Sequence, residues 1–154
     1  DIVINVQGDE PEMEPELLDA VAREVEGGED FVTAAAVITE PALLTDPSVV
    51  NVVVDREDYA LYFSRSEIPY ERHYVEDAAP FLAHIGIYGF RREALLRLVE
   101  AEPGLYERVE GLEQLRILEH GWRIKVVRAP RYHGSVDTMA DYRAFVERWR
   151  GGTP

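Results

Sequence analysis

The chain has 154 residues, enough for one ordinary domain, and its 16 basic and 30 acidic residues give a formal net charge of −14. This charge argues against a general nucleic-acid binder, because such proteins neutralise phosphates with Lys and Arg. The chain contains no cysteine, which excludes disulfides and thiolate chemistry, and no apolar run approaches the roughly 18 residues that cross a membrane. We expect a cytoplasmic protein that binds neither nucleic acid nor membrane.

The first residues form an apolar run rich in β-branched side chains, which is typical of a strand buried on both faces of a sheet. A natural domain rarely begins inside such a strand, so we expect residues 1–154 to be a single domain that is N-terminally incomplete. The run ends at Gln7-Gly8-Asp9-Glu10-Pro11, where two carboxylates come together. Ligands of open α/β sheets bind beyond the carboxyl ends of strands, and Mg²⁺ prefers carboxylates together with substrate phosphates. The alternative is a solvated acidic loop that ends a buried strand.

Hydrophobic patterns alternate through the rest of the chain. Helical periods predict helices over residues 15–26, 91–100, 110–120 and 139–149, and apolar β-rich runs predict strands over 31–38, 81–90 and 122–129. Two further β-rich runs, 49–54 and 59–63, flank a short charged connection and predict a hairpin. Residues 41–47 are expected to form a loop or short helix, 64–80 a long excursion and 151–154 a frayed tail. The pattern indicates an α/β layered domain with parallel N-terminal strands and an antiparallel hairpin.

Two strand regions carry residue types that suit an anionic, hydroxyl-rich ligand. Arg65 directly follows the hairpin, where its guanidinium can bind a carboxylate or phosphate through two parallel hydrogen bonds; the alternative is a surface arginine in a loop. His84, Gly86 and Tyr88 share one face of the strand over 81–90, because side chains alternate with a period of two. Such a face makes a poor core but a good lining for a polar ligand, and the glycine would admit close approach of a substrate. A lone histidine is more often structural.

Carboxylates recur in two later stretches. Glu107, Glu110, Glu113 and Gln114 follow helical spacing and would form one polar stripe, facing either a hydroxyl-rich ligand or solvent. Asp137 precedes the last helix, where its carboxylate can cap backbone N–H groups or reach a metal with its free oxygen. The four histidines lack the separation of metal ligands.

Five segments, in this order, resemble the 3-deoxy-manno-octulosonate cytidylyltransferases, or CMP-Kdo synthetases. They are Val3-Ile4-Asn5-Val6-Gln7-Gly8-Asp9-Glu10-Pro11, Ala60-Leu61-Tyr62-Phe63-Ser64-Arg65 with Ile68-Pro69, His84-Ile85-Gly86-Ile87-Tyr88-Gly89, Leu112-Glu113-Gln114-Leu115-Arg116 and Val136-Asp137-Thr138. The resemblance runs along nearly all of the chain but covers only the later part of the family's sequence, without its Gly-rich nucleotide-binding loop. It implies a Rossmann-like nucleotidyltransferase fold, with three layers (αβα), a mixed, mostly parallel sheet and an inserted antiparallel hairpin.

The family joins CMP from CTP to 3-deoxy-D-manno-octulosonate (Kdo), releasing pyrophosphate, in lipopolysaccharide biosynthesis, and it uses Mg²⁺. The resemblance implies that Asp9 and Asp137 bind the metal and act in catalysis, and that Gln7 contacts substrate near the reacting centre. It also implies a homodimer, with the hairpin and residues 64–70 as the contact region. The sugar pocket would be lined by Arg65, which faces the sugar carboxylate, and by His84, Gly86, Tyr88, Glu110 and Gln114.

Some features depart from the family pattern or leave alternatives open. Ser135 stands where relatives usually have glycine, and Met139-Ala140-Asp141 replaces a common Pro-Glu-Asp; both leave Asp137 in place. Glu113 could equally be structural. The acidic sugar could instead be 8-amino-Kdo or a sialic acid, or the chain could be a non-catalytic sugar-binding or dimerisation fragment. Because the nucleotide-binding loop is missing, we expect the 154-residue chain alone to be inactive.

Overall fold

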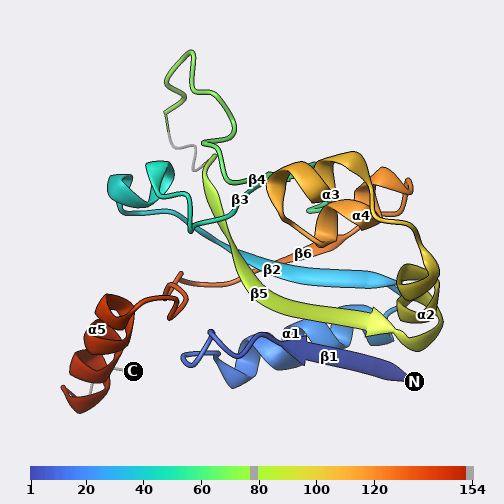
Figure 1. Ribbon diagram of the computed structural model, residues 1–154, viewed down its shortest axis with the longest axis horizontal. Coiled ribbons are helices and arrows are strands. Elements are labelled where there is room, and N and C mark those ends of the chain that lie inside the picture. The colour runs from blue at the N-terminus through green and yellow to red at the C-terminus, as the bar shows by residue number, and fades with distance from the viewer. Residues whose placement is uncertain (77–79, 152–154) are drawn as a thin grey trace.

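The computed structural model describes residues 1–76 and 80–151 (Figure 1). Its strands are β1 (Ile2–Val6), β2 (Phe31–Val37), β3 (Asn51–Val54), β4 (Ala60–Ser64), β5 (Leu82–Arg91) and β6 (Lys125–Arg128). Its helices are α1 (Pro15–Glu26), the 3₁₀ helix η1 (Pro41–Thr45), α2 (Arg92–Glu100), α3 (Leu105–Glu110), α4 (Gln114–Glu119) and α5 (Met139–Arg150). The predicted strands and hairpin are confirmed. Residues 77–79 of the predicted excursion and 152–154 of the predicted tail lie outside the described residues.

β5 is the strand around which the sheet is built. One edge of β5 pairs with β2. The other edge pairs first with β3, where Asn51 lies opposite Ala83, and then with β1, where Val6 lies opposite Ile87. The strand order is β4-β3-β5-β2-β6, with β1 beside the second half of β5. A short stretch of β5, between β3 and β1, therefore has no strand neighbour on that edge.

The sheet is mixed, as the sequence predicts, but it is not mostly parallel. Among the described strands, β2 and β6 form the one parallel pair, and the other four pairs are antiparallel. β1 and β2 do run in the same direction, because both are antiparallel to β5, but β5 lies between them. This intervening strand comes from much later in the chain, so the patterns of neighbouring segments could not place it.

Helices cover both faces of the sheet and give the expected three layers. On one face, α1 places Leu17, Val21 and Val25 at four-residue spacing in a core cluster with Val32 and Ile87. The other face carries a second cluster, to which α2, α4 and the hairpin contribute Ala94, Leu115, Ile117 and Phe63 around Phe31. Burying each large apolar side chain is worth about 1.5–3 kcal/mol, so the two clusters hold β5 firmly between them.

β1 is not buried on both faces, contrary to prediction. Ile2 is 38% exposed and Val3 37%, and Ile4 packs against the cluster beneath α1. The reason is that β1 pairs with β5 alone, and no described strand covers its other edge. An apolar β-branched run predicts a strand but does not say which strands flank it.

The helix predicted over 110–120 is instead a turn and a short helix. α3 ends at Glu110, Gly111 takes up a left-handed conformation (φ 66°), and α4 begins at Gln114. Glycine favours this conformation because it has no Cβ. The turn breaks the predicted polar stripe: Glu107 is buried and bonded to Arg116, away from the other members.

α5 extends away from the sheet at the end of the described chain (Figure 1). Its Arg148 forms an ion pair with Glu12, in the segment that follows β1. Within residues 1–76 and 80–151, no helix is both long enough and apolar enough to cross a membrane.

Candidate active site

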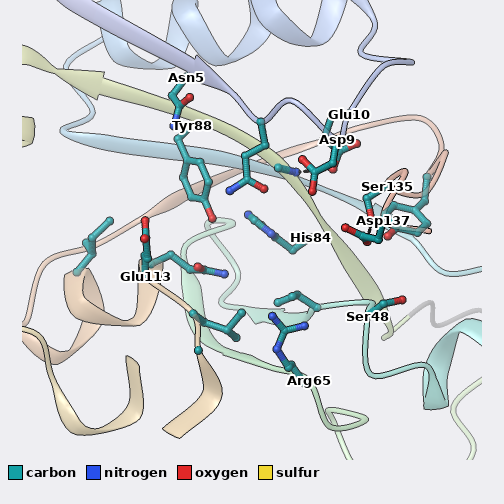
Figure 2. Close-up of a pocket in the computed structure, with 18 of the residues that line it drawn as sticks. Asn5, Asp9, Glu10, Ser48, Arg65, His84, Tyr88, Glu113, Ser135 and Asp137 are labelled. Carbon is teal, nitrogen blue, oxygen red and sulfur yellow. Dashed lines mark hydrogen bonds between the residues drawn. The ribbon is translucent and has the colours of Figure 1, made fainter. Parts of the chain in front are cut away.

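A cavity of about 500 Å³ lies over the middle of β5, beside the stretch between β3 and β1 (Figure 2). Its walls come from the end of β1, the end of the hairpin, the start of α4 and the segment before α5. This volume falls in the range of small-molecule sites. Eight of the nine predicted site residues line it, namely Gln7, Asp9, Arg65, His84, Gly86, Tyr88, Gln114 and Asp137.

Asp9 and Asp137 lie on the same side of the cavity although they come from opposite ends of the chain (Figure 2). The backbone N–H of Val136 donates a hydrogen bond to the carbonyl oxygen of Asp9 at 2.8 Å, which joins the two segments. The hydroxyl of Ser135 donates to the Asp137 carboxylate at 2.5 Å. A backbone hydrogen bond therefore keeps the segments of the two aspartates side by side.

The capping role considered for Asp137 belongs to Thr138. The Thr138 hydroxyl accepts a hydrogen bond from the backbone N–H of Asp141, and the Asp141 carboxylate accepts one from the backbone N–H of Thr138. This capping box satisfies the first turn of α5. The Asp137 carboxylate is therefore available to the cavity that it lines.

The acidic wall of the cavity fits a hard cation. Asp9, Glu10 and Asp137 all line the cavity. Burial raises the pKa of Glu10, and the charges of Asp9 and Asp137 raise it further. Among the described residues, no group of three or more His, Cys, Asp or Glu side chains could hold a metal by itself. Mg²⁺ keeps several waters and is bound by one or two carboxylates plus substrate phosphates. The donor set Asp9 and Asp137 suits that mode of binding.

Gly86 lines the cavity, but the side chains of Gln7 and Glu10 occupy the space into which its Cβ would point. Its N–H donates to Glu10 Oε1 at 2.9 Å, and its carbonyl accepts from the Gln7 N–H at 2.9 Å. A Cβ at this position would lie 2.6 Å from Gln7 Oε1, so only glycine fits without displacing that side chain. Gln7 and Glu10 take the place of the strand neighbour that β5 lacks here.

His84 and Tyr88 form a neutral polar wall. His84 is buried, its Nε2 lies 2.8 Å from Oγ1 of Thr33, and burial lowers its pKa to about 4. Burial also raises the pKa of Tyr88 far above its usual value. Both groups are uncharged near neutral pH, so they can exchange hydrogen bonds with hydroxyl groups but cannot supply positive charge.

Arg65 is the one arginine or lysine that lines the cavity within the described part of the chain. Its Nε donates to the carbonyl oxygen of Glu110 at 3.1 Å, and its Nη1 donates to that of Pro47 at 2.9 Å. These bonds fix the guanidinium, which points into the cavity in Figure 2.

Glu110 is the predicted residue that does not line the cavity. Its carboxylate accepts hydrogen bonds from the Ser64 hydroxyl at 2.7 Å and from the Arg65 N–H at 3.1 Å. Glu110 therefore orients Arg65, and it does not face the space where a ligand would lie. The turn at Gly111 separates it from Gln114, which does line the cavity.

Other lining residues were not predicted as part of the site. Glu113, whose role was open, lines the cavity, as do Asn5, Ser48, Tyr132 and Ser135. Burial raises the pKa of Tyr132 to about 12, so it too is a neutral hydroxyl. Tyr132 stands in a segment without hydrophobic periodicity, and nothing in the sequence marked it. Thr33, behind His84, was hidden inside an apolar run.

Comparison with known proteins agrees with this arrangement. Residues 1–125 match a family model described as cytidylyltransferase. The chain is 45% identical to the 3-deoxy-manno-octulosonate cytidylyltransferase of Chloroherpeton thalassium, over 92% of this chain and 58% of the relative. It is 43% identical to the enzyme of the same name from Methylococcus capsulatus, over 99% of this chain and 63% of the relative. The resemblance carried by the five segments is therefore confirmed.

A solved structure confirms the fold class. It is the structure of a CMP:2-keto-3-deoxy-manno-octonic acid synthetase complexed with CTP, with a TM-score of 0.83 and 36% sequence identity. The match covers 98% of this chain and 61% of that chain. The chain thus spans about three fifths of the length of the proteins it matches.

Proposed function

Because the chain belongs to the cytidylyltransferase family, we propose that the protein joins CMP from CTP to Kdo and releases pyrophosphate. The relatives from Chloroherpeton and Methylococcus carry the name of this activity. The observation that carries the proposal is one cavity in which two aspartates stand on one side and an arginine with neutral hydrogen-bonding groups on another. The first set suits a metal-bound triphosphate, and the second suits an acidic, hydroxyl-rich sugar.

The proposed reaction is a single nucleotidyl transfer. The anomeric hydroxyl oxygen of the sugar forms a bond to the α-phosphorus of CTP, and the bond from that phosphorus to its bridging oxygen breaks. Pyrophosphate leaves with the electron pair of that bond, and the hydroxyl proton passes to solvent. Transfers of this kind depend mainly on positioning and on stabilisation of charge.

The residues on the sugar side have distinct roles in this proposal. Arg65, fixed by two backbone carbonyls, directs its remaining N–H groups toward the sugar carboxylate. His84, Tyr88 and Gln114 exchange hydrogen bonds with the sugar hydroxyls. Gln7 lies against Gly86 and next to the acidic wall, so its amide is placed to contact substrate near the reacting centre.

Asp9 and Asp137 would hold Mg²⁺. When bound, the ion neutralises phosphate charge and orients the triphosphate. The two carboxylates otherwise repel the anionic nucleotide, and Arg65 is the one basic side chain that lines the described cavity. The backbone hydrogen bond from the N–H of Val136 to the carbonyl oxygen of Asp9 holds together the two segments that carry these carboxylates.

The proposal includes a homodimer that works in the cytoplasm, in lipopolysaccharide biosynthesis. The segment after β4 protrudes from the body (Figure 1) and exposes Tyr70, Tyr74 and Val75. Exposed aromatic side chains on a protruding segment favour a protein interface. Sedimentation of the Tyr70→Ser, Tyr74→Ser double variant should show a shift toward monomer, and an unchanged dimer would remove this segment from the interface.

Another acidic sugar is a second candidate for the substrate, because the wall of the cavity assigned to the sugar carries one cation and several neutral hydrogen-bonding groups. A sialic acid or 8-amino-Kdo also carries a carboxylate and hydroxyl groups. The relative turnover of the three sugars decides between them, since the metal site is common to all.

The test uses the full-length protein with CTP, Mg²⁺ and each sugar in turn. Pyrophosphate release should require an acidic sugar, should be fastest with Kdo, and should stop when a chelator removes the metal. Release of pyrophosphate without sugar, or none with any of the three sugars, would overturn the proposal.

A further inference from the structure

Thr33 lies in β2 where the pairing between β2 and β5 is interrupted. Thr33 pairs with Tyr88, whereas the next residue, Ala34, pairs with Ile85, so Gly86 and Ile87 stand outside the regular ladder. Such bulges re-aim side chains next to functional sites. The Thr33 hydroxyl donates a hydrogen bond of 2.7 Å to the carbonyl oxygen of Ile87, which lies in this interruption. The side chain of Thr33 is fully buried.

The same hydroxyl fixes the tautomer of His84. Oγ1 of Thr33 lies 2.8 Å from Nε2 of His84. A hydroxyl has one hydrogen, and Thr33 gives it to the carbonyl oxygen of Ile87, which can only accept. Toward His84 the hydroxyl is therefore the acceptor, and Nε2 carries the hydrogen. In the neutral ring, Nδ1 then keeps a free lone pair.

Nδ1 of His84 opens on the cavity. Among the described residues, the one fully buried side-chain polar atom without a hydrogen-bond partner is Oδ1 of Asn51. Nδ1 of His84 also makes no hydrogen bond within those residues, and it is not one of the fully buried atoms, so part of its surface is open to solvent. His84 lines the cavity between Tyr88 and Arg65 (Figure 2), so this open surface faces the cavity.

We propose that Thr33 is a positioning residue that presents His84 to the sugar as a hydrogen-bond acceptor only, at Nδ1. This inference rests on the proposed function and deepens it. The group that binds Nδ1 must be a donor, and in Kdo that group is a hydroxyl. His84 therefore recognises one hydroxyl of the sugar, while the carboxylate is left to Arg65.

The chemistry of this contact makes a selective prediction. A sugar analogue in which that hydroxyl is methylated keeps its acceptor lone pairs but loses its donor. Such an analogue should bind weakly, because the Nδ1 lone pair is left unpaired when water is displaced. Loss of Thr33 frees the ring to adopt the other tautomer, and the discrimination between hydroxyl and methoxy should then decrease.

The first measurement is nitrogen NMR of the full-length protein labelled at histidine, without substrates. The His84 signals are identified by their loss in a His84→Gln variant. We expect a protonated Nε2 and an unprotonated Nδ1 in the wild type, and a mixture of tautomers in Thr33→Val. A wild-type ring protonated at Nδ1 would overturn the inference, whether or not the protein is a cytidylyltransferase.

The second measurement is steady-state kinetics of Thr33→Val, with Thr33→Ser as the conservative variant. Thr33→Val should raise KM for the sugar about tenfold with little change in KM for CTP, because one hydrogen bond to the sugar is weakened. Thr33→Ser should restore both the wild-type KM and the tautomer, and Thr45→Val, at an exposed threonine, should change neither. If Thr33→Val leaves the tautomer and the sugar KM unchanged, Thr33 has no positioning role.

Discussion

Val136 donates its backbone N–H to the carbonyl oxygen of Asp9 at 2.8 Å, so the end of the first strand and the segment before the last helix meet at one hydrogen bond. The bond places Asp9 and Asp137 on one wall of the cavity. The opposite side is built by β5 and the end of the hairpin, which carry His84, Tyr88 and Arg65. The site thus depends on long-range contacts that bring separate strands to the same gap in the sheet.

Gly86→Ala should separate activity from stability. The added Cβ would lie 2.6 Å from Gln7 Oε1 and 3.1 Å from Glu10 Oε1, both ends of flexible side chains that can move. We expect thermal unfolding within a few degrees of the wild type. The value of kcat/KM should fall about 10- to 100-fold, because Gln7 would leave the position in which we propose that it contacts substrate.

Gly8→Ala is the matched control for this prediction, since nothing lies within 4 Å of a Cβ at that position. It should keep wild-type activity. If Gly86→Ala is as active as Gly8→Ala, the packing of Gln7 on Gly86 has no part in catalysis.

Arg65→Lys should weaken sugar binding and spare the nucleotide. Lysine keeps the charge but cannot make both bonds to the carbonyl oxygens of Pro47 and Glu110, nor a two-point contact with a carboxylate. We expect KM for the sugar to rise at least tenfold while KM for CTP stays within about twofold. Arg92→Lys, an exposed arginine at the start of α2 that does not line the cavity, serves as the control. A larger effect on CTP than on the sugar would place Arg65 at the nucleotide instead.

Glu110→Gln should also raise KM for the sugar, because Glu110 positions Arg65. The carboxylate accepts hydrogen bonds from Ser64 and from the Arg65 N–H, whereas an amide has one oxygen to accept and presents donors on its nitrogen. We expect a several-fold rise in KM for the sugar. In the Arg65→Lys background the same change should add little, which kinetic analysis of the double variant measures; full additivity would show that Glu110 acts independently.

The ion pair of Glu107 and Arg116 should make the free energy of unfolding depend on pH. Hydrogen bonds from Arg116 hold the pKa of Glu107 below its ordinary value of 4.5. A carboxyl with a depressed folded pKa contributes stability above its unfolded pKa, and this contribution is lost as pH falls through the folded value. Arg116→Met should lower the free energy of unfolding at pH 7 by about 1.5–3 kcal/mol. It should also flatten the decline in stability below pH 4.5.

Urea unfolding of both proteins over a series of pH values measures this effect. Arg143→Met removes an exposed arginine of α5 and should leave the curve unchanged. Parallel curves for the wild type and Arg116→Met would contradict the assigned ion pair.

The sequence predicted which segments form helices and strands better than it predicted which strands pair with one another. Periodicity located α1 correctly, because Leu17, Val21 and Val25 depend only on local spacing. It could not place β5 between β1 and β2, since strand partners are set by distant segments. For the same reason the exposure of Val3 was missed: an apolar run does not reveal that one edge of its strand is open in the described structure.

The candidate site shows the same limit. The residue types at Asp9, His84 and Arg65 pointed to chemistry, and the cavity brings them together. Thr33 could not be recognised, because a threonine in an apolar strand gives no sign of a partner 51 residues away. The resemblance implied that Glu110 lines the sugar pocket, and helical spacing put it in one stripe with Gln114; the stripe is lost because Gly111 breaks the helix.

The central claim is that Asp9 and Asp137 form one metal site for nucleotidyl transfer. The most direct measurement is Mg²⁺-dependent pyrophosphate release by the full-length wild type, Asp9→Asn, Asp137→Asn and the double variant, with Asp19→Asn, an exposed aspartate of α1, as control. We predict that each single change lowers kcat/KM at least 100-fold and that the double change costs little more, because residues that act as a unit are not additive. Single variants with near wild-type activity, or a double variant whose loss equals the product of the two single losses, would contradict the claim.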